Sequence, residues 1–306
     1  LITLILVCTM NNITNAQNPF YGQYHTPHEA VPFDRIETEH YEPAILEGIK
    51  LQNAEIEAII QNPEKADFTN TIEAFEESGK LLDKVVAVFG NMLSAETNDD
   101  LQELAQKIMP LLSEHSNNIT LNEKLFARVK EVYNQKETLQ LTQEQKQLLE
   151  NAYNSFIRHG ANLEGEAREE YRRLTTELSK LTLTFSENNL KETNAYQMLL
   201  TKKESLAGLP EIIIEAAAET AKNEEKEGWA FTLHAPSYIP FMTYSDNRDL
   251  RQKLYMAYNT KCTHDNEFNN IDIVKKIANT RMKIAQLLGY KDYAEYTLKK
   301  RMAENS

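Results

Sequence analysis

Residues 166–191 read EAREEYRRLTTELSKLTLTFSENNLK. Their apolar side chains recur at steps of three and four residues, which places them on one narrow stripe of a helix. The stripe consists of Tyr171, Leu174, Leu178, Leu181 and Phe185. We expect this helix to pack through the stripe against other helices of the same chain.

A second helix is predicted directly before this one. Thr142 and Gln145 have the spacing of a capping box, in which each side chain bonds the free backbone N–H of the other residue. The helix that they start ends at Gly160. Its apolar residues at helical spacing are Leu148, Leu149, Tyr153, Phe156 and Ile157. We expect residues 142–160 and 166–191 to form a long antiparallel helical hairpin.

The same periodicity recurs along the rest of the chain. Further helices are expected at 41–61, 71–92, 98–110 with a kink at Pro110, 121–133, 209–222, 248–259, 271–288 and 293–302. The 306 residues include only 9 glycines and 9 prolines, too few for a loop-rich β-sandwich. The predicted fold class is therefore mainly α, an elongated array of helices.

One small β element is expected within residues 195–244. Residues 229–233 alternate like a half-buried strand, residues 238–242 are its predicted partner, and residues 195–200 form another short strand. Pro236 and Pro240 lack the backbone N–H that continuous pairing needs. Any sheet in this segment is therefore small.

The charge balance bears on possible partners. The formal net charge is -13, which repels phosphate backbones and anionic lipid, so nucleic acid is excluded as an expected partner. A content of 41% hydrophobic and 26% charged residues is typical of a globular protein without a membrane span. We expect a monomer.

Residues 1–17, LITLILVCTMNNITNAQ, have the pattern of the end of a secretory signal peptide. A short apolar run precedes a polar stretch, and Thr14 and Ala16 are small residues at the two positions that a signal peptidase reads. We expect cleavage after Ala16 and export to the periplasm. Cys262 is then the sole cysteine of the remaining chain, so no intramolecular disulfide is expected.

The metal-binding motif His-Glu-x-x-His does not occur in the 306 residues. That motif places two histidines one helical turn apart, so that both bind one zinc ion beside a glutamate that serves as general base. The sequence most similar to this motif starts at His28-Glu29, but Pro32 stands where the second histidine would be needed. Neither a Gly-x-Ser-x-Gly elbow nor a Cys-x-x-Cys pair is present. No catalytic or metal-binding residue is therefore assigned to this chain.

Several short strings are distinctive in combination. They are PFDRIETEHYEPA at 32–44, FTNTI at 68–72, SAETN at 94–98, LSKL at 178–181, TLHAPSY at 232–238, NRDLR at 247–251, and Gly289-Tyr290 followed by Tyr293-Ala294. Together they resemble the bacterial peptidyl-dipeptidases of the thimet oligopeptidase family of zinc metallopeptidases. The resemblance begins at Asn18 and extends over nearly all of the remaining chain.

The resemblance implies a mostly helical enzyme that is split by a deep channel and hydrolyses short unfolded peptides. In that family the zinc ion is held by the two histidines of His-Glu-x-x-His and a later glutamate, all in the second half of the chain. None of these positions has a counterpart here. The resemblance thus implies an N-terminal fragment that forms a channel wall and is inactive alone, and the pattern of residues 1–17 predicts that it is exported. This chain would bind no cofactor, and zinc is expected in the full-length enzyme.

The resemblance also suggests three parts of the chain. Residues 1–17 would be the remnant of a signal peptide and residues 18–193 an N-terminal helical region with the hairpin. Residues 194–306 would form a mixed segment in which the catalytic region starts, truncated before the zinc motif.

Candidate contacts with peptide substrate are His234, Tyr238 and Tyr244, because aromatic rings offer rigid contact area at low entropic cost. The alternative interpretation is that the aromatic residues of this segment form an ordinary core. The alternative function is a non-catalytic helical module that binds peptides or other partners. Reading the gene beyond Ser306 separates the two functions, because a peptidase requires His-Glu-x-x-His there.

Overall fold

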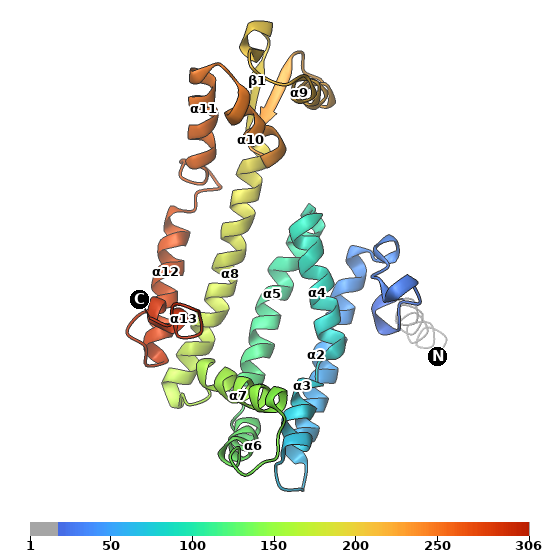
Figure 1. Cartoon of the computed structure of the whole chain (residues 1–306), viewed down its shortest axis with the longest axis vertical. Coiled ribbons are helices and arrows are strands. Elements are labelled where there is room, and N and C mark those ends of the chain that lie inside the picture. The colour runs from blue at the N-terminus through green and yellow to red at the C-terminus, as the bar shows by residue number, and fades with distance from the viewer. Residues whose placement is uncertain (1–17, 306) are drawn as a thin grey trace, which may run out of the picture. The chain divides into compact units, whose positions relative to one another are not determined.

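The computed structural model describes residues 18–305, so the predicted signal segment 1–17 lies outside the described residues. The chain divides into two compact units, which we describe separately. Of the described residues, unit 1 comprises 18–180 and 281–305, and unit 2 comprises 181–280. In the described part of the chain the structure is mainly helical, with one two-stranded sheet, which confirms the predicted fold class (Figure 1).

Unit 1 consists of helices and helical turns. They are η1 (Pro19–Tyr21), η2 (Pro27–Glu29), η3 (Phe33–Arg35), α2 (Thr38–Gln61), η4 (Phe68–Glu73), α3 (Ala74–Glu76), α4 (Lys80–Ala95), α5 (Asp99–Thr120), α6 (Glu123–Asn134), α7 (Gln143–Arg158) and α13 (Tyr293–Leu298). The first half of α8 (Gly165–Ala195) and the end of α12 (Ile271–Leu287) also belong to it. Among residues 18–305, every helix is too short or too polar to cross a lipid bilayer.

Local side chains set several helix starts. The predicted capping box is present at α7, where Thr142 Oγ1 accepts from the N–H of Gln145 at 3.3 Å and Gln145 Oε1 accepts from the N–H of Thr142 at 3.0 Å. Asn98 caps α5 in the same manner, because its side chain accepts from the N–H of Leu101 at 2.8 Å. Such caps satisfy backbone donors that have no partner within the helix.

Helices α2, α4 and α5 lie side by side in unit 1 (Figure 1). Gly48 permits the close approach of α2 and α4, because a Cβ at this position would lie 2.9 Å from the Cα of Leu82. Helix α5 continues through Pro110 to Thr120 and is therefore longer than the predicted helix 98–110. Buried residues before and after Pro110, among them Ile108 and Ile119, hold both halves of α5 in place despite the lost hydrogen bond.

The predicted hairpin of helices 142–160 and 166–191 is wrong. Helix α7 packs on α6, where the rings of Tyr133 and Tyr153 stack with centroids 3.8 Å apart. The stripe of α8 instead packs through Tyr171 and Leu174 against Leu121 and Ile284. The apolar residues of α7, among them Leu149 and Phe156, are buried in the larger core cluster of unit 1. They are therefore not available to pack against α8.

The helix predicted at 71–92 is interrupted. The chain forms the π-helical turn η4, the short helix α3 and then α4, with Gly79 between the last two at φ +79°. Only glycine adopts this left-handed conformation without steric cost, so Gly79 permits the change of direction. The predicted final helix at 293–302 is also shorter, because α13 ends at Leu298.

Unit 2 contains the second half of α8, the start of α12 and six shorter elements. These are β1 (Gln197–Leu200), η5 (Lys203–Leu206), α9 (Glu211–Asn223), β2 (Trp229–Thr232), α10 (Ala235–Tyr244) and α11 (Arg248–Asn259). The two strands are antiparallel, with Met198 opposite Phe231 and Leu200 opposite Trp229. Met198, Phe231, Phe241 and Leu254 are buried together in the core of this unit.

The small β element predicted within residues 195–244 is confirmed, but one of its strands was assigned wrongly. The partner of β2 is β1, and the predicted strand 238–242 lies in helix α10. Pro236 stands in the first turn of α10, where the missing N–H has no helical partner in any case. Pro236, which argued against a central strand, is thus compatible with the first turn of a helix.

Candidate functional site

Helix α10 of unit 2 carries or adjoins all three predicted substrate contacts. His234 is the residue before the helix, and its exposed ring bonds two side chains: Nε2 lies 2.9 Å from Asn194 Oδ1 and Nδ1 lies 3.2 Å from Thr232 Oγ1. These bonds hold the imidazole against the end of α8 and the end of β2. His234 is thus well positioned by unit 2 itself.

Tyr238 belongs to a group of aromatic side chains from two helices. Its ring stacks on that of Tyr258 in α11, with centroids 4.2 Å apart and an interplanar angle of 20°. Lys261 Nζ lies 4.4 Å from the centroid of the Tyr258 ring, a cation–π contact. Burial raises the pKa of Tyr238, and the nearby Tyr258 and Tyr255 raise it further. We call Tyr238, Tyr255, Tyr258 and Lys261 the tyrosine face.

Tyr244 occupies a separate place at the other end of α10. Its side chain is 52% exposed. Its backbone lies close to Gly208, at φ +85°, where a Cβ would lie 2.3 Å from the carbonyl oxygen of Tyr244. Ten residues of helix separate His234 from Tyr244, a rise of roughly 15 Å. The three predicted contacts therefore do not form one compact site, and Tyr238 is the one that lies within an aromatic group.

A cluster that sequence reasoning missed ties the loop after α11 to the end of α8. Glu192 Oε1 lies 2.6 Å from Nδ1 of His264, and the other carboxylate oxygen accepts from the backbone N–H of Cys262. Lys261 Nζ also donates to Thr193 Oγ1 at 3.0 Å. We call Glu192, Cys262 and His264 the Glu192 clamp. No spacing in the sequence indicated it, because Glu192 is 72 residues from His264.

The Glu192 clamp has the residue types of a catalytic or metal-binding cluster but not their arrangement. Cys262 is buried at φ +58°, and burial together with the neighbouring Glu192 carboxylate raises the pKa of its thiol to about 11. A protonated thiol is a poor nucleophile and a poor zinc ligand. Within residues 18–305, no three His, Cys, Asp or Glu side chains are grouped to hold a metal ion. The clamp is therefore a structural tie.

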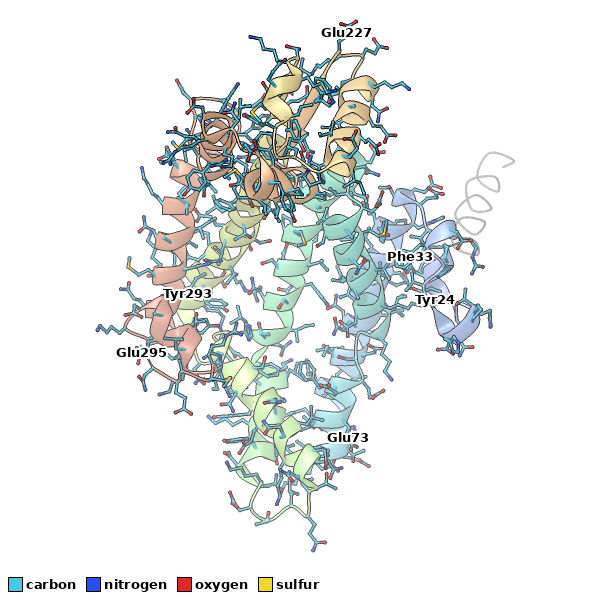
Figure 2. All side chains as sticks on the ribbon, turned by 45° about the horizontal axis from the view of Figure 1, so that its top comes forward. Tyr24, Phe33, Glu73, Glu227, Tyr293 and Glu295 are labelled. Carbon is cyan, nitrogen blue, oxygen red and sulfur yellow. The ribbon has the colours of Figure 1, made fainter. Side chains whose placement is uncertain are left out.

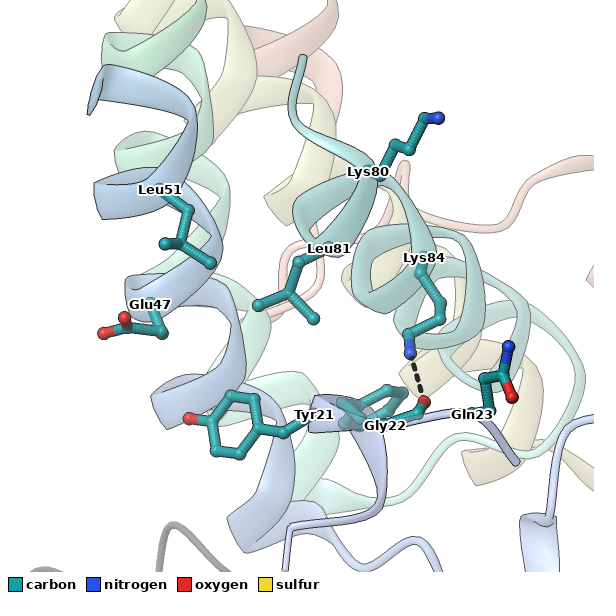
Figure 3. Close-up of a pocket in the computed structure, with 9 residues that line it drawn as sticks. Tyr21, Gly22, Gln23, Glu47, Leu51, Lys80, Leu81 and Lys84 are labelled. Carbon is teal, nitrogen blue, oxygen red and sulfur yellow. Dashed lines mark hydrogen bonds between the residues drawn. The ribbon is translucent and has the colours of Figure 1, made fainter. Parts of the chain in front are cut away.

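Unit 1 carries a surface pocket of about 570 Å³ between α2, α4 and the segment that follows η1. It is lined by Glu47 and Leu51 of α2 and by Lys80, Leu81 and Lys84 of α4, and the side chains of Leu51 and Leu81 point toward each other (Figure 3). Lys84 Nζ donates to the carbonyl oxygen of Gly22 at 3.0 Å. Glu47 pairs with Lys50 and Lys80 pairs with Glu77. The charges around this pocket are thus largely used within unit 1.

Two further groups in unit 1 join aromatic rings to cations. Lys84 Nζ lies 4.8 Å from the ring centroid of Tyr24, and Arg281 lies 5.4 Å from that of Tyr293; both tyrosines are labelled in Figure 2. Arg158 donates to the backbone carbonyl of Tyr296 at 2.9 Å and stacks over its ring at 4.2 Å. These contacts attach the N-terminal segment and residues 290–298 to the helices of unit 1.

Comparison with known proteins shows what the chain is similar to. The model of peptidase family M3 matches residues 241–306. "Dipeptidyl carboxypeptidase" of Escherichia coli (strain K12) is 35% identical over 288 residues, which cover 94% of this chain and 42% of that protein. "Oligopeptidase A" of Haemophilus influenzae is 32% identical over 278 residues, 90% of this chain and 41% of that protein.

The similarity extends to plants at lower identity. "Probable cytosolic oligopeptidase A" of Arabidopsis thaliana is 27% identical over 300 residues, 95% of this chain and 42% of that protein. The chain thus spans about two fifths of the length of the curated relatives that it matches. The match to residues 241–306 and the similarity over nearly the whole chain thus show that the protein is similar to members of peptidase family M3.

Proposed function

We propose that this chain forms part of a zinc-dependent M3 peptidase that hydrolyses short unfolded peptides, and that it lines the space in which the peptide binds. The observation that carries the proposal is the 35% identity over 288 residues to a "Dipeptidyl carboxypeptidase". Similarity at this level extends through both units and includes the segment that contains α10 and α11.

The metal of the proposed enzyme is not assigned to this chain. The nearest cluster of suitable residue types, the Glu192 clamp, does not fit a zinc ion. Its carboxylate oxygens are engaged by His264 Nδ1 and the N–H of Cys262, and the thiol of Cys262 is held in the protonated form. We therefore derive no catalytic step from these residues. The proposal places the zinc ligands in a part of the peptidase that corresponds to the remaining length of the relatives.

The proposed contribution of this chain is to position peptide. Unit 2 carries tyrosine rings on α10 and α11. The rings of Tyr238 and Tyr258 are held by stacking and by the cation–π contact of Lys261, and the Glu192 clamp fixes the loop that follows α11. Rings held in this way provide contact area without the entropic cost of ordering flexible side chains. Release of dipeptides, as opposed to internal cleavage, belongs to the same proposal and rests on the name of the relative alone.

Export is a second part of the proposal. It rests on the apolar run and the small residues Thr14 and Ala16 in the first 17 residues. Expression of the chain with a C-terminal tag, followed by cell fractionation and N-terminal sequencing, tests it. Export predicts a periplasmic product that begins at Gln17. A product that stays in the cytoplasm with residues 1–16 attached contradicts it.

The enzymatic part is tested with a short peptide blocked at its N-terminus. Its hydrolysis is measured with this chain and with the complete product of the gene, each with zinc and with a chelator. The proposal predicts zinc-dependent hydrolysis by the complete product and none by this chain. Absence of hydrolysis by the complete product in the presence of zinc favours the alternative, a helical module that binds peptides without cleaving them.

A further inference from the structure

The part of α12 that belongs to unit 2 has apolar side chains on two different sides. Ile273 and Ile277, one turn apart, lie on the inner side, where Ile277 is buried. Ile271, Val274 and Ala278 follow at intervals of three and four residues on another side, and all three are exposed. At about 100° per residue, the two sides lie roughly 110° apart around the helix axis. We call Ile271, Val274 and Ala278 the outer row of α12.

The outer row is unusual for a helix at a protein surface. Ile271 is 39% exposed and Val274 is 48% exposed. The third side of the helix already carries the polar residues expected toward water, Asp272, Lys275 and Asn279. A surface helix needs only one apolar side, whereas apolar residues on two sides are typical of a helix that is covered from two directions. The outer row is therefore a surface that lacks its cover in this chain.

Hydrogen bonds determine which side of α12 faces outward. Asn270, the buried residue before the helix, donates from its side chain to the carbonyl of Phe185 in α8 at 3.0 Å and accepts from Asn188 Nδ2 at 2.9 Å. The N–H of Val274 in turn donates to the carbonyl of Asn270 at 2.8 Å. The first turn of α12 is thus bound to α8. The outer row cannot rotate inward to bury itself without breaking these bonds.

Three observations indicate what covers the outer row. Helix α12 lies within residues 241–306, the segment that the M3 family model matches. The relative in Escherichia coli extends far beyond the similar region, because the aligned residues make up 42% of that protein. Only α13 stands between α12 and residue 306 among the described elements, and elements that are close in the sequence are usually adjacent in space. The covering element is therefore expected in the part of a complete M3 peptidase that follows residue 306.

We infer that the outer row of α12 is an interface, covered in the complete gene product by apolar side chains from the part that follows residue 306. The inference rests on the proposed function, because it assigns a docking surface to the part of the peptidase in which that proposal places the zinc ligands. Ala278, the smallest member of the row, permits close approach of the covering element. Asp272, Lys275 and Asn279 remain on the side that faces water.

Cysteine labelling tests the inference in the complete gene product and in this chain. The variants are Val274→Cys in the outer row and Lys276→Cys, an exposed position on the opposite side of α12, as the matched control. Both carry Cys8→Ser, and the rate of modification by N-ethylmaleimide is read by mass spectrometry of the peptide that contains the new thiol. The native Cys262 adds little signal, because its raised pKa of about 11 leaves few thiolates.

The expected result is protection of one position only. Val274→Cys should react about tenfold or more slowly in the complete product than in this chain, because a covered thiol reacts only when the interface opens. Lys276→Cys should react at similar rates in both. Equal rates of Val274→Cys in the complete product and in this chain would overturn the inference.

Thermal unfolding provides a second measurement that does not depend on a new thiol. Val274→Ser is expected to lower the unfolding midpoint of the complete product and to leave that of this chain unchanged, because the side chain is exposed only in this chain. Lys276→Ser is the control and should change neither midpoint. An equal shift by Val274→Ser in both proteins, or a shift in neither, would contradict the inference.

Further outcomes separate this inference from others. Protection of Val274→Cys in this chain that increases with its concentration would assign the outer row to a second copy and overturn the inference. Zinc-dependent hydrolysis by the complete product without protection of Val274→Cys would refute the inference and leave the proposed function standing. Protection in the complete product without hydrolysis would do the reverse.

Discussion

His264 Nδ1 lies 2.6 Å from Oε1 of Glu192, so a side chain in the loop after α11 is bonded to a side chain near the end of α8. The same carboxylate accepts from the backbone N–H of Cys262. Asn270, at the end of this loop, is also tied to α8, because its side chain donates to the carbonyl of Phe185 at 3.0 Å. The loop that follows the tyrosine face is therefore held by polar bonds to a single helix.

Glu192→Gln is expected to destabilise unit 2. The amide keeps one acceptor oxygen but places an NH₂ group where a second acceptor is needed, and a bond to a half-buried charged group is worth about 1–3 kcal/mol. Urea unfolding followed by the fluorescence of Trp229 reports on this unit. Glu219→Gln, at an exposed position of α9, is the control and should change the midpoint little. Equal midpoints for the two variants would show that the clamp contributes nothing.

The stability of unit 2 is expected to depend on pH through Glu192. Burial raises the pKa of this carboxyl, but hydrogen bonds from His264 and Cys262 together outweigh burial, so the net pKa is below its ordinary value of 4.5. A carboxyl with a lowered pKa in the folded state stabilises the fold at higher pH, and this contribution is lost as the pH falls through the folded-state pKa. The free-energy difference between the native chain and Glu192→Gln should therefore be constant above about pH 5 and shrink below it. A difference that grows toward acid pH contradicts the assignment.

Cys262 is expected to react slowly with thiol reagents in the folded chain. Its pKa of about 11 leaves little thiolate at pH 8. Compared with an ordinary thiol of pKa about 8.5, alkylation should be slower by about two orders of magnitude. The measurement is mass spectrometry after iodoacetamide, with and without urea, in a Cys8→Ser background. Alkylation at the same rate in native and unfolded chains would contradict both the burial and the raised pKa.

Gly48→Ala is expected to destabilise unit 1 by about 1–3 kcal/mol, because the added Cβ would overpack the contact of α2 with the backbone of Leu82. This loss exceeds the gain of up to about 1 kcal/mol that alanine brings to a helix interior. Gly90→Ala in α4 is the matched control, because a Cβ there meets no described atom within 4 Å outside its own helix. Thermal unfolding should show the two variants shifted in opposite directions.

Local patterns in the sequence predicted local structure well. The spacing of Thr142 and Gln145 indicated the start of α7, since both partners of a capping box lie within four residues. Residues 238–242 show where such reasoning fails. Their short apolar run fits a strand or a buried helix equally. The contact of Tyr238 with Tyr258, which favours α10, joins two helices and cannot be recognised from the local spacing of apolar residues.

Relationships between distant residues could not be predicted from the sequence. The stripe of α8 was recognised, but its partners Leu121 and Ile284 come from segments far from it in the chain. In the Glu192 clamp, Glu192 is 70 residues from Cys262 and 72 residues from His264 in the sequence, and the three residues belong to no recognisable motif. Of the predicted substrate contacts, Tyr238 lies in the tyrosine face, while Tyr255, Tyr258 and Lys261 were not identified in advance.

The central proposal is that this chain forms part of a peptidase whose metal is held by residues outside it. The most direct measurement is the hydrolysis of a blocked short peptide by residues 18–306, compared with the complete product of the gene, with and without added zinc. The account predicts zinc-dependent turnover by the complete product alone. Zinc-dependent turnover by residues 18–306 would contradict it.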